Sequence, residues 1–314
     1  MLAQAQHVDS LENQQILKVG PARFGKTPMT FAQEGFFSAE IDKFRTHVRS
    51  TEPSKLWFDY ALDLVRIGFK MLGPLETSLS DERLLYLNAA FVRVHQTFQS
   101  VLVLAERGLI NDARTVLRGG VETAIAINAL AGDPGFVGQI KDAHFRSRRT
   151  LANKIKEHFA DSYTPEQLAN FDAEIAEANA WEAAKGTPGG RKAELTDIKW
   201  EQTAALYSHE LYQLLYRSFS ADGAHFTLDA LQRVLVVDEK GRITGLNVGP
   251  VYNGTGLIDV LSGAVLMFIG SAAPFAEING LTDDDATIQA RVQEFEKLPN
   301  AFPTFAPFTR TARG

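Results

Sequence analysis

The charged side chains between Leu84 and Phe159 are the first candidates for a functional site in this chain. Most of the stretch follows a helical pattern of Ala, Leu, Ile and Val. A charge inside an apolar helical region is costly unless it is paired or used. The charged residues in question are Arg114, Arg118, Glu122, His144 and Arg148. They match no established catalytic motif, so their chemistry has to be argued from spacing.

Arg114, Arg118 and Glu122 recur every four residues, so a helix places all three along one face and lets Arg118 pair with Glu122. Two interpretations are open. The row is either a half-buried ladder of ion pairs that fixes the helix register, or an anion site that uses the arginine forks to bind phosphate oxygens. If Arg118 is buried, Glu122→Ala should cost about 2 to 4 kcal/mol of stability.

A second polar set lies near Tyr216. Tyr212 and Tyr216 are four residues apart and can stack on one helix, and Arg217 follows them. His225 comes where the helical pattern loosens. Histidine is the side chain best suited to proton transfer near neutral pH. A single histidine of this kind also commonly has a structural hydrogen-bonding role, so both roles stay open for His225.

The segment Gly20 to Thr27 matches the phosphate-binding loop pattern of ATPases letter for letter. That pattern works when a strand feeds the loop and backbone N–H groups after the threonine face the phosphates. Pro28 follows directly and has no N–H to donate. Val234 to Glu239 imitates the acidic strand of such enzymes, but the intervening chain has no strand pattern. We therefore expect no ATPase, and a role for this loop stays open.

Composition excludes several classes of function. The net charge is −6 and there is no cysteine, so we expect no disulfide, no thiolate nucleophile and no zinc–thiolate site. We also expect no metal and no cofactor. The N-terminus lacks a secretory signal pattern, which favours a cytoplasmic protein. Val260 to Phe275 carries no charge but is shorter than the roughly 20 residues of a membrane span, so we interpret it as a buried core helix.

The elements that must position these residues are mostly helices. Apolar residues recur at three- and four-residue spacing throughout, as on one face of a helix. Helices are predicted over Ser38–Arg49, Pro53–Leu72, Ser80–Arg107, Leu109–Leu130, Phe136–Phe159, Gln167–Lys185, Trp200–Ser220, Leu257–Phe275 and Asp284–Leu298.

One hairpin interrupts the helices. Val234 to Val237 and Ile243 to Val248 are β-branched runs that flank a turn containing Gly241. The predicted fold is therefore all-α, a multi-helix bundle with one inserted β-hairpin at about 233–248. We predict an N-terminal arm with helices over 1–78, a helical core domain over 79–278, and a C-terminal helix with a Phe- and Pro-rich strap over 279–314.

The scattered polar residues also carry a resemblance. They are Ala113, Arg114, Arg118, Glu122, Asp133, Pro134, Arg146, Tyr216, Ser220 and His225. Their pattern resembles Domain of Unknown Function 5677, a prokaryotic family of helical proteins, over roughly Leu84 to Phe275. That family is in turn similar to the HEPN superfamily, whose helical bundles are often dimers and include metal-independent ribonucleases.

The HEPN resemblance implies an RNA-cleaving protein in a toxin or phage-defence setting, with RNA as a partner and a homodimer as its assembly. His225 and Arg217 would be catalytic, with Arg114, Arg118, Glu122, Tyr216, His144 and Arg148 supporting them or binding the anion. Seven residues separate Arg217 from His225, one more than the superfamily pattern allows. The alternative is a non-catalytic helical module that binds a small anionic ligand or a protein partner.

Overall fold

The computed structural model describes residues 30–73, 75, 80–186, 194–223, 234–238, 240–250 and 254–299. Three predicted features lie outside these residues: the match to a phosphate-binding loop at Gly20 to Thr27, the candidate His225, and the C-terminal strap beyond Pro299. Within them the chain forms an all-α bundle with one small antiparallel hairpin, which confirms the predicted fold class.

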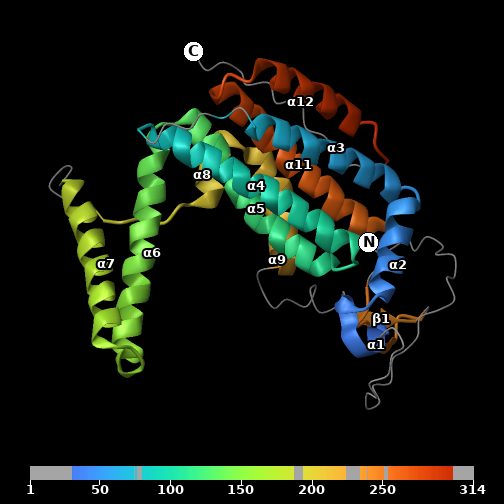
Figure 1. Cartoon of the computed structure of the whole chain (residues 1–314), viewed down its shortest axis with the longest axis horizontal. Coiled ribbons are helices and arrows are strands. Elements are labelled where there is room, and N and C mark those ends of the chain that lie inside the picture. The colour runs from blue at the N-terminus through green and yellow to red at the C-terminus, as the bar shows by residue number, and fades with distance from the viewer. Residues whose placement is uncertain are drawn as a thin grey trace.

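The centre of the bundle is the apolar helix α11 (Gly254–Ile278). It packs against α3 (Ser54–Leu72), α4 (Glu82–Glu106) and α5 (Ile110–Gly132), as Figure 1 shows. By length and composition α11 could cross a membrane, but 89% of its most apolar window is buried inside the protein. This burial is what the sequence predicted for the uncharged stretch, because neighbouring helices cover its apolar surface.

Aromatic stacking and small residues bring these helices together. The rings of Phe91 on α4 and Phe275 on α11 stack with centroids 3.8 Å apart. Where α5 meets α11, a Cβ added at Gly120 would lie 2.3 Å from the sulfur of Met267. Glycine therefore leaves room for the Met267 side chain between the two helices, and a larger residue would have to displace that side chain.

In the outer layer of the bundle, the C-terminal helix α12 (Thr282–Phe295) packs beside α3, which lies near the N-terminus. Helix α12 covers α11, and the Phe295 ring lies edge-on to Trp57 of α3 at 5.7 Å. The hydroxyl of Tyr60 donates to the carbonyl of Arg291 at 2.5 Å, and burial raises the pKa of Tyr60. The N-terminal elements before α3 are α1 (Phe31–Glu34), η1 (Gly35–Phe37) and α2 (Glu40–Ser50).

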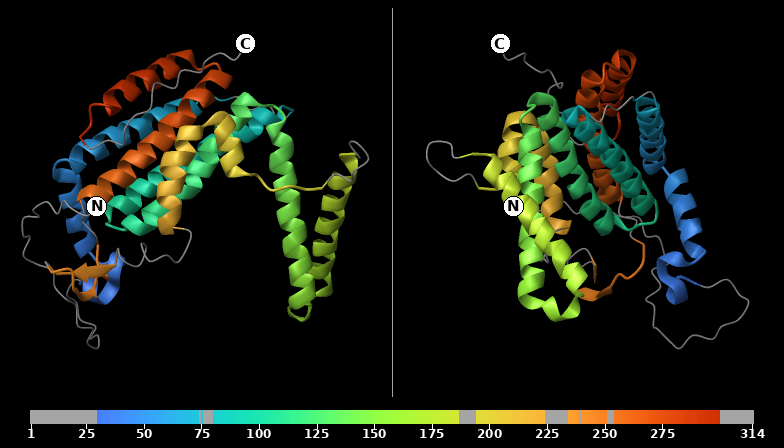
Figure 2. Two further views of the ribbon diagram at one scale, coloured as in Figure 1. Left: turned by 180° about the vertical axis from the view of Figure 1, so that it is seen from behind. Right: turned by 60° about the vertical axis from the view of Figure 1, so that its left-hand side comes forward.

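Helices α6 (Phe136–His158) and α7 (Pro165–Ala184) form an antiparallel arm that projects away from the bundle (Figure 2). The short turn η2 (Ala160–Ser162) connects them. Thr164 accepts from the backbone N–H of Gln167 while the Gln167 side chain accepts from the backbone of Thr164. This reciprocal cap, with Pro165 in the first turn, is the helix start that the sequence predicts.

The chain returns from the arm through an extended segment, residues 194–199, to a broken helix. The sequence predicts one helix from Trp200 to Ser220, and the structure corrects this to three pieces, α8 (Trp200–Tyr207), the π-helix η4 (Leu211–Tyr216) and α9 (Arg217–Gly223). Ser208 ends α8 with a non-helical backbone, at φ −164° and ψ 54°. A π-helical turn shifts the rotational register of the side chains that follow it.

The hairpin pairs β1 (Leu235–Val237) with β2 (Ile243–Leu246), within the predicted limits. Gly241 takes φ +76° in the turn. Asp238 accepts from the backbone N–H and the side chain of Arg242 and from the backbone N–H of Lys240, and these bonds lower the pKa of the Asp238 carboxyl. The Asp238 carboxylate, which resembled the acidic residue of an ATPase strand, thus closes the turn of the hairpin.

Candidate functional site

Helix α5 and the η4–α9 segment bring together four polar side chains, Arg118, Glu122, Tyr216 and Ser220, which we name the Arg118 cluster. Arg118 donates from Nε to Oγ of Ser220 at 3.0 Å and from Nη2 to the hydroxyl of Tyr216 at 2.8 Å. The same Nη2 lies 3.4 Å from Oε1 of Glu122, which confirms the predicted pairing along α5. The cluster therefore joins residues almost a hundred positions apart in the chain.

A cation–π contact between Arg114 and Phe219 holds α9 against α5 next to the Arg118 cluster. Arg114 is buried, its guanidinium carbon lies 4.6 Å above the centre of the Phe219 ring, and its Nη2 donates to the carbonyl of Ser218 at 3.3 Å. On α11, a Cβ at Gly263 would lie 2.7 Å from the Phe219 ring. Gly263 thus lets Phe219 approach α11, and Arg114 fixes the position of α9 against α5.

Tyr216 holds the plane of Arg118 from a second direction. The guanidinium carbon of Arg118 lies 5.0 Å from the centre of the Tyr216 ring. Tyr212 stacks on the same ring at 4.8 Å and 14°, as its spacing predicts. Loss of solvent raises the pKa of Tyr212, and nearby Glu201 and Tyr216 add to this effect. A guanidinium fixed by two hydrogen bonds and a ring contact is pre-organised for planar recognition of an anion.

The Arg118 cluster is half-buried rather than enclosed. The side chains of Arg118 and Glu122 are each 27% exposed. The condition for a large penalty on Glu122→Ala is therefore not met, because Arg118 keeps solvent and two other partners when the carboxylate is removed. We expect a cost of about 1 kcal/mol instead. Among the described residues, no protein group accepts a hydrogen bond from Nη1 of Arg118.

Arg217 begins α9 one residue after Tyr216, and its side chain is exposed. Its Nη1 donates to Oε1 of Gln213 at 3.0 Å on the preceding turn. The predicted partner of Arg217, His225, lies outside the described residues. The described end of α9 nevertheless leads directly into the segment that carries this histidine.

The structure places His144 and Arg148 away from the Arg118 cluster, on the arm. His144 is exposed on α6 with its ring 5.3 Å from Phe145. Arg148 pairs with Glu174 of α7. The partners of Arg148 thus come from α7, whereas those of Arg118 come from α5, η4 and α9. The sequence-predicted set divides between two places in the molecule.

Two structural contributors to this site were not singled out from the sequence. Phe219 and Gly263 act through the packing between α9 and α11, and they are separated by the hairpin in the chain. A glycine in an otherwise apolar helix was the available signal, since such a residue commonly marks a close approach. In the part of the chain that the structure describes, no group of three or more histidines or carboxylates could hold a metal ion.

A comparison with protein families gives one match. The model of a Family of unknown function (DUF5677) matches residues 84–242, about half of the chain, and this range contains the arm and the whole Arg118 cluster. No curated protein and no solved structure matches the chain.

Proposed function

This chain belongs to the DUF5677 family, and we propose that it binds a phosphate-bearing ligand, RNA, at the Arg118 cluster. One observation carries the proposal, the half-exposed guanidinium of Arg118, whose plane Tyr216 and Ser220 fix while Nη1 stays without a protein partner among the described residues. Arginine presents paired N–H donors that match phosphate oxygens. Arg217, which directly follows Tyr216 and is exposed, is the next cation along the chain.

The net charge of −6 makes this a local rather than a general attraction. RNA binding by a surface of this kind depends on a few arginines and on aromatic faces, not on a basic protein overall. The Tyr212–Tyr216 pair supplies such an aromatic group next to Arg118. We further propose a homodimer and a toxin or phage-defence setting, which the HEPN resemblance drawn from the sequence would imply. We also propose a cytoplasmic location, which the sequence at the N-terminus favours.

The binding proposal is tested by fluorescence anisotropy with a labelled single-stranded RNA. Arg118→Ala should weaken binding at least about tenfold, since it removes a charge-assisted phosphate contact. Tyr216→Phe keeps the ring but removes the hydroxyl that orients Arg118, so its loss should be smaller. Arg66→Ala is the matched control, because Arg66 is exposed on α3 and pairs locally with Asp63. Equal affinity of the wild type and Arg118→Ala would refute the proposal.

Cleavage of the bound RNA is the second candidate function, and the position of Arg217 favours it. Arg217 is exposed rather than buried in an ion pair, and His225 follows the last residue of α9 by two positions in the sequence. His225 would take the proton of a 2'-hydroxyl as that oxygen bonds to the adjacent phosphorus. The bond from phosphorus to the 5'-oxygen then breaks, and the 5'-oxygen leaves with a proton from solvent. Arg217 would stabilise the charge on the phosphoryl oxygens.

The cleavage proposal is tested with purified protein and mixed cellular RNA. His225→Ala should reduce cleavage about 100-fold or more, the scale of a lost general acid or base. Products should end in a 2',3'-cyclic phosphate, and chelators should leave the rate unchanged. If the protein binds RNA through Arg118 but shows no His225-dependent cleavage, it is a binding module. If His225→Ala unfolds the protein, the same measurement on Arg217→Ala decides the question.

A further inference from the structure

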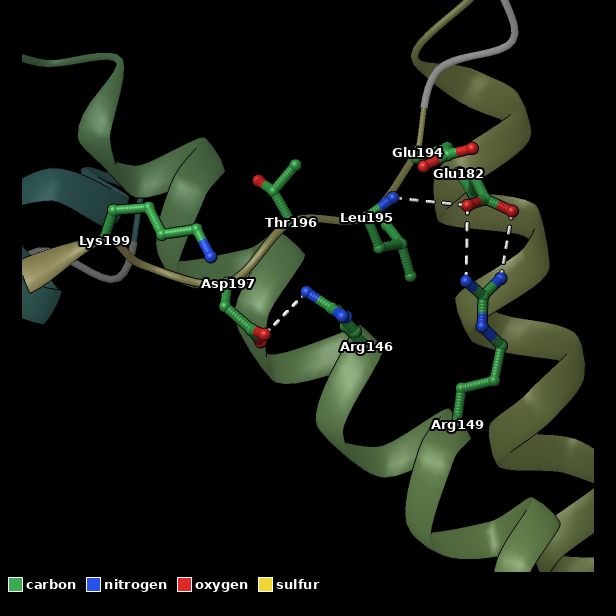
Figure 3. Close-up of a pocket in the computed structure, with 8 residues that line it drawn as sticks. All are labelled: Arg146, Arg149, Glu182, Glu194, Leu195, Thr196, Asp197 and Lys199. Atoms are coloured by element: carbon green, nitrogen blue, oxygen red, sulfur yellow. Dashed lines mark hydrogen bonds and ion pairs between the residues drawn. The ribbon is translucent and has the colours of Figure 1, made fainter.

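A second polar hollow lies at the root of the arm, away from the Arg118 cluster. It occupies about 510 Å³ between α6, the end of α7 and the extended segment 194–199 (Figure 3). Its volume is within the range of small-molecule sites, but its lining is mostly charged. The lining residues are Arg146, Arg149, Glu182, Glu194, Leu195, Thr196, Asp197 and Lys199.

One charge pair in this hollow is part of the arm's structure. Arg149 of α6 donates to both carboxylate oxygens of Glu182 on α7, at 2.9 and 3.3 Å. Glu182 also accepts from the backbone N–H of Leu195 at 3.2 Å. Their side chains are only 24% and 10% exposed. This bidentate pair holds α6, α7 and the returning segment together, so neither partner is available to a ligand.

The other charge pair is open to exchange. Nη1 of Arg146 lies 2.6 Å from Oδ2 of Asp197, and the two side chains are 45% and 53% exposed. An exposed pair of this kind is worth about 0 to 1 kcal/mol. A group with two negative charges can therefore replace the single carboxylate of Asp197 on the Arg146 fork at little cost.

Lys199 adds a second cation to the same wall. Its exposed side chain runs toward the Arg146–Asp197 pair in Figure 3, and within the described ranges it has no hydrogen-bond or ion-pair partner. Glu194 is the unfavourable charge in the lining, and it lies beside Glu182 on the far side of Leu195 in that view. When Asp197 moves aside, Arg146 and Lys199 together present a charge of +2.

We propose that this hollow binds a dianionic phosphate group, as free phosphate or a phosphate monoester, through Arg146 and Lys199. Asp197 occupies the Arg146 fork until the ligand displaces it. The freed Arg146 and Lys199, unpaired among the described residues, match the two charges of a monoester, whereas a backbone phosphodiester carries one. Thr196 lies on the same segment, and its hydroxyl makes a long, 3.5 Å hydrogen bond to Asp142 that a phosphate oxygen would replace. This site is independent of the Arg118 cluster and of RNA binding there.

The experiment is calorimetric titration of the full-length protein with AMP, inorganic phosphate and adenosine. Lys199→Ala and Arg146→Ala should each weaken AMP binding at least about tenfold, since each removes one charge-assisted contact. Asp197→Asn should strengthen it severalfold, because the competing carboxylate is lost. Lys154→Ala is the matched control, since Lys154 is an exposed cation on α6 outside the hollow.

The choice of probe separates the two sources of phosphate. Equal binding of AMP and inorganic phosphate indicates that the phosphate group alone is read, and tighter AMP binding indicates a monoester with its organic part. Adenosine should not bind. At pH 5 the affinity for AMP should fall about tenfold, because a phosphate monoester with a second pKa near 6 is then mostly monoanionic. No histidine lines the hollow.

Two outcomes would overturn the proposal. One is the absence of saturable AMP binding by the wild type. The other is binding that Lys199→Ala, Arg146→Ala and Asp197→Asn leave unchanged. Arg118→Ala should not affect AMP binding, so failure of the RNA proposal and failure of this one give different patterns. Thermal melts of each variant guard against unfolding, and Asp197→Asn keeps the test decisive if Arg146→Ala does not fold.

Discussion

The bundle and the arm are built from helices of similar length that are held together by different forces. In the bundle, α4, α5 and α11 bury apolar faces against one another. In the arm, α6 carries six Lys or Arg residues, whereas α7 carries five Asp or Glu residues and no Lys or Arg. The charges pair across the arm as Arg148–Glu174, Arg149–Glu182 and Lys156–Asp172. Between residues 137 and 184, the two helices of the arm bury three residues, Asp142, Ala152 and Ala178, and only the two alanines are apolar.

The bundle and the arm should therefore respond to different solution conditions. Burial of apolar surface is insensitive to moderate salt, whereas attraction between exposed charges weakens as salt shortens the screening length from about 10 Å at 0.1 M to about 3 Å at 1 M. Each proposed ligand site also belongs to one region, since the Arg118 cluster lies on the bundle and the phosphate hollow lies on the arm. Conditions that loosen the arm should therefore affect the hollow before they affect the Arg118 cluster.

The largest expected effect is in the bundle core. Phe268 is fully buried and stacks on Phe98 with centroids 5.0 Å apart. Phe268→Ala should lower the free energy of unfolding by about 3 to 5 kcal/mol, because it removes apolar contacts and leaves a cavity. Leu151→Ala is the arm counterpart at 60% exposure, and it should stay within about 0.5 kcal/mol. Urea unfolding measures both, and comparable losses would break the distinction between the regions.

A pair of neighbouring glycines on α5 gives the next effect in size. Gly120→Ala should destabilise by about 1 to 3 kcal/mol, since its Cβ meets Met267 at 2.3 Å and Thr97 at 2.7 Å. Gly119 has open space, so Gly119→Ala should stabilise by about 0.5 to 1 kcal/mol through helix propensity. The same urea experiment reads both signs. A gain at both positions would show that α5 and α11 separate easily.

The arm should lose about 1 kcal/mol when its best ion pair is removed. Glu182→Gln weakens the bidentate contact with Arg149, and 1 M NaCl screens the remaining exposed pairs. Amide hydrogen exchange should therefore speed up in α7 and stay unchanged in α11. Asp59→Asn on the exposed outside of α3 is the control for loss of a carboxylate, since Asp59 pairs locally with Lys55 on the same helix. Uniform acceleration of both helices would contradict an arm held by charge.

Mild acid should destabilise the bundle, whereas salt should destabilise the arm. His95 is buried, Nε2 lies 3.0 Å from the carbonyl of Val65, and desolvation lowers its pKa. Its neutral form therefore contributes stability that is fully present above the unfolded value near 6.5 and is lost as the pH falls below it. The urea midpoint should fall from pH 7.5 to pH 5, and this pH dependence should shrink in His95→Gln. Exposed His158 in the arm is the control, and an unchanged slope in His95→Gln would remove His95 as the cause.

The sequence predicted most of the fold because each element has its own local signal. The capping pair at Thr164 and Gln167 marks the start of α7, and Gly241 marks the hairpin turn. The break at Ser208 carries no such signal, since neither glycine nor proline stands there, and the π-helix that follows depends on packing against α5. The domain limits at 78 and 278 stay predictions.

The Arg118 cluster was half predictable. Four-residue spacing placed Arg118 beside Glu122 and Tyr212 beside Tyr216, because both pairs lie on one helix. Spacing could not show that Arg118 meets Tyr216 and Ser220, since those contacts join distant helices. For the same reason the sequence did not separate His144 and Arg148 from the cluster, or reveal the hollow at Asp197 and Lys199.

The central position of α11 has a consequence for how the protein is made. Helices α3, α4 and α5 leave the ribosome first, but the helix that covers their apolar faces begins at Gly254. At roughly 5 to 20 residues per second, the interval between α5 and α11 lasts on the order of ten seconds. During that time the nascent chain exposes the surface that α11 will bury. Its yield in cells should therefore depend on chaperones that hold unfinished chains, and a premature stop before Gly254 should give an aggregating fragment rather than a shorter bundle.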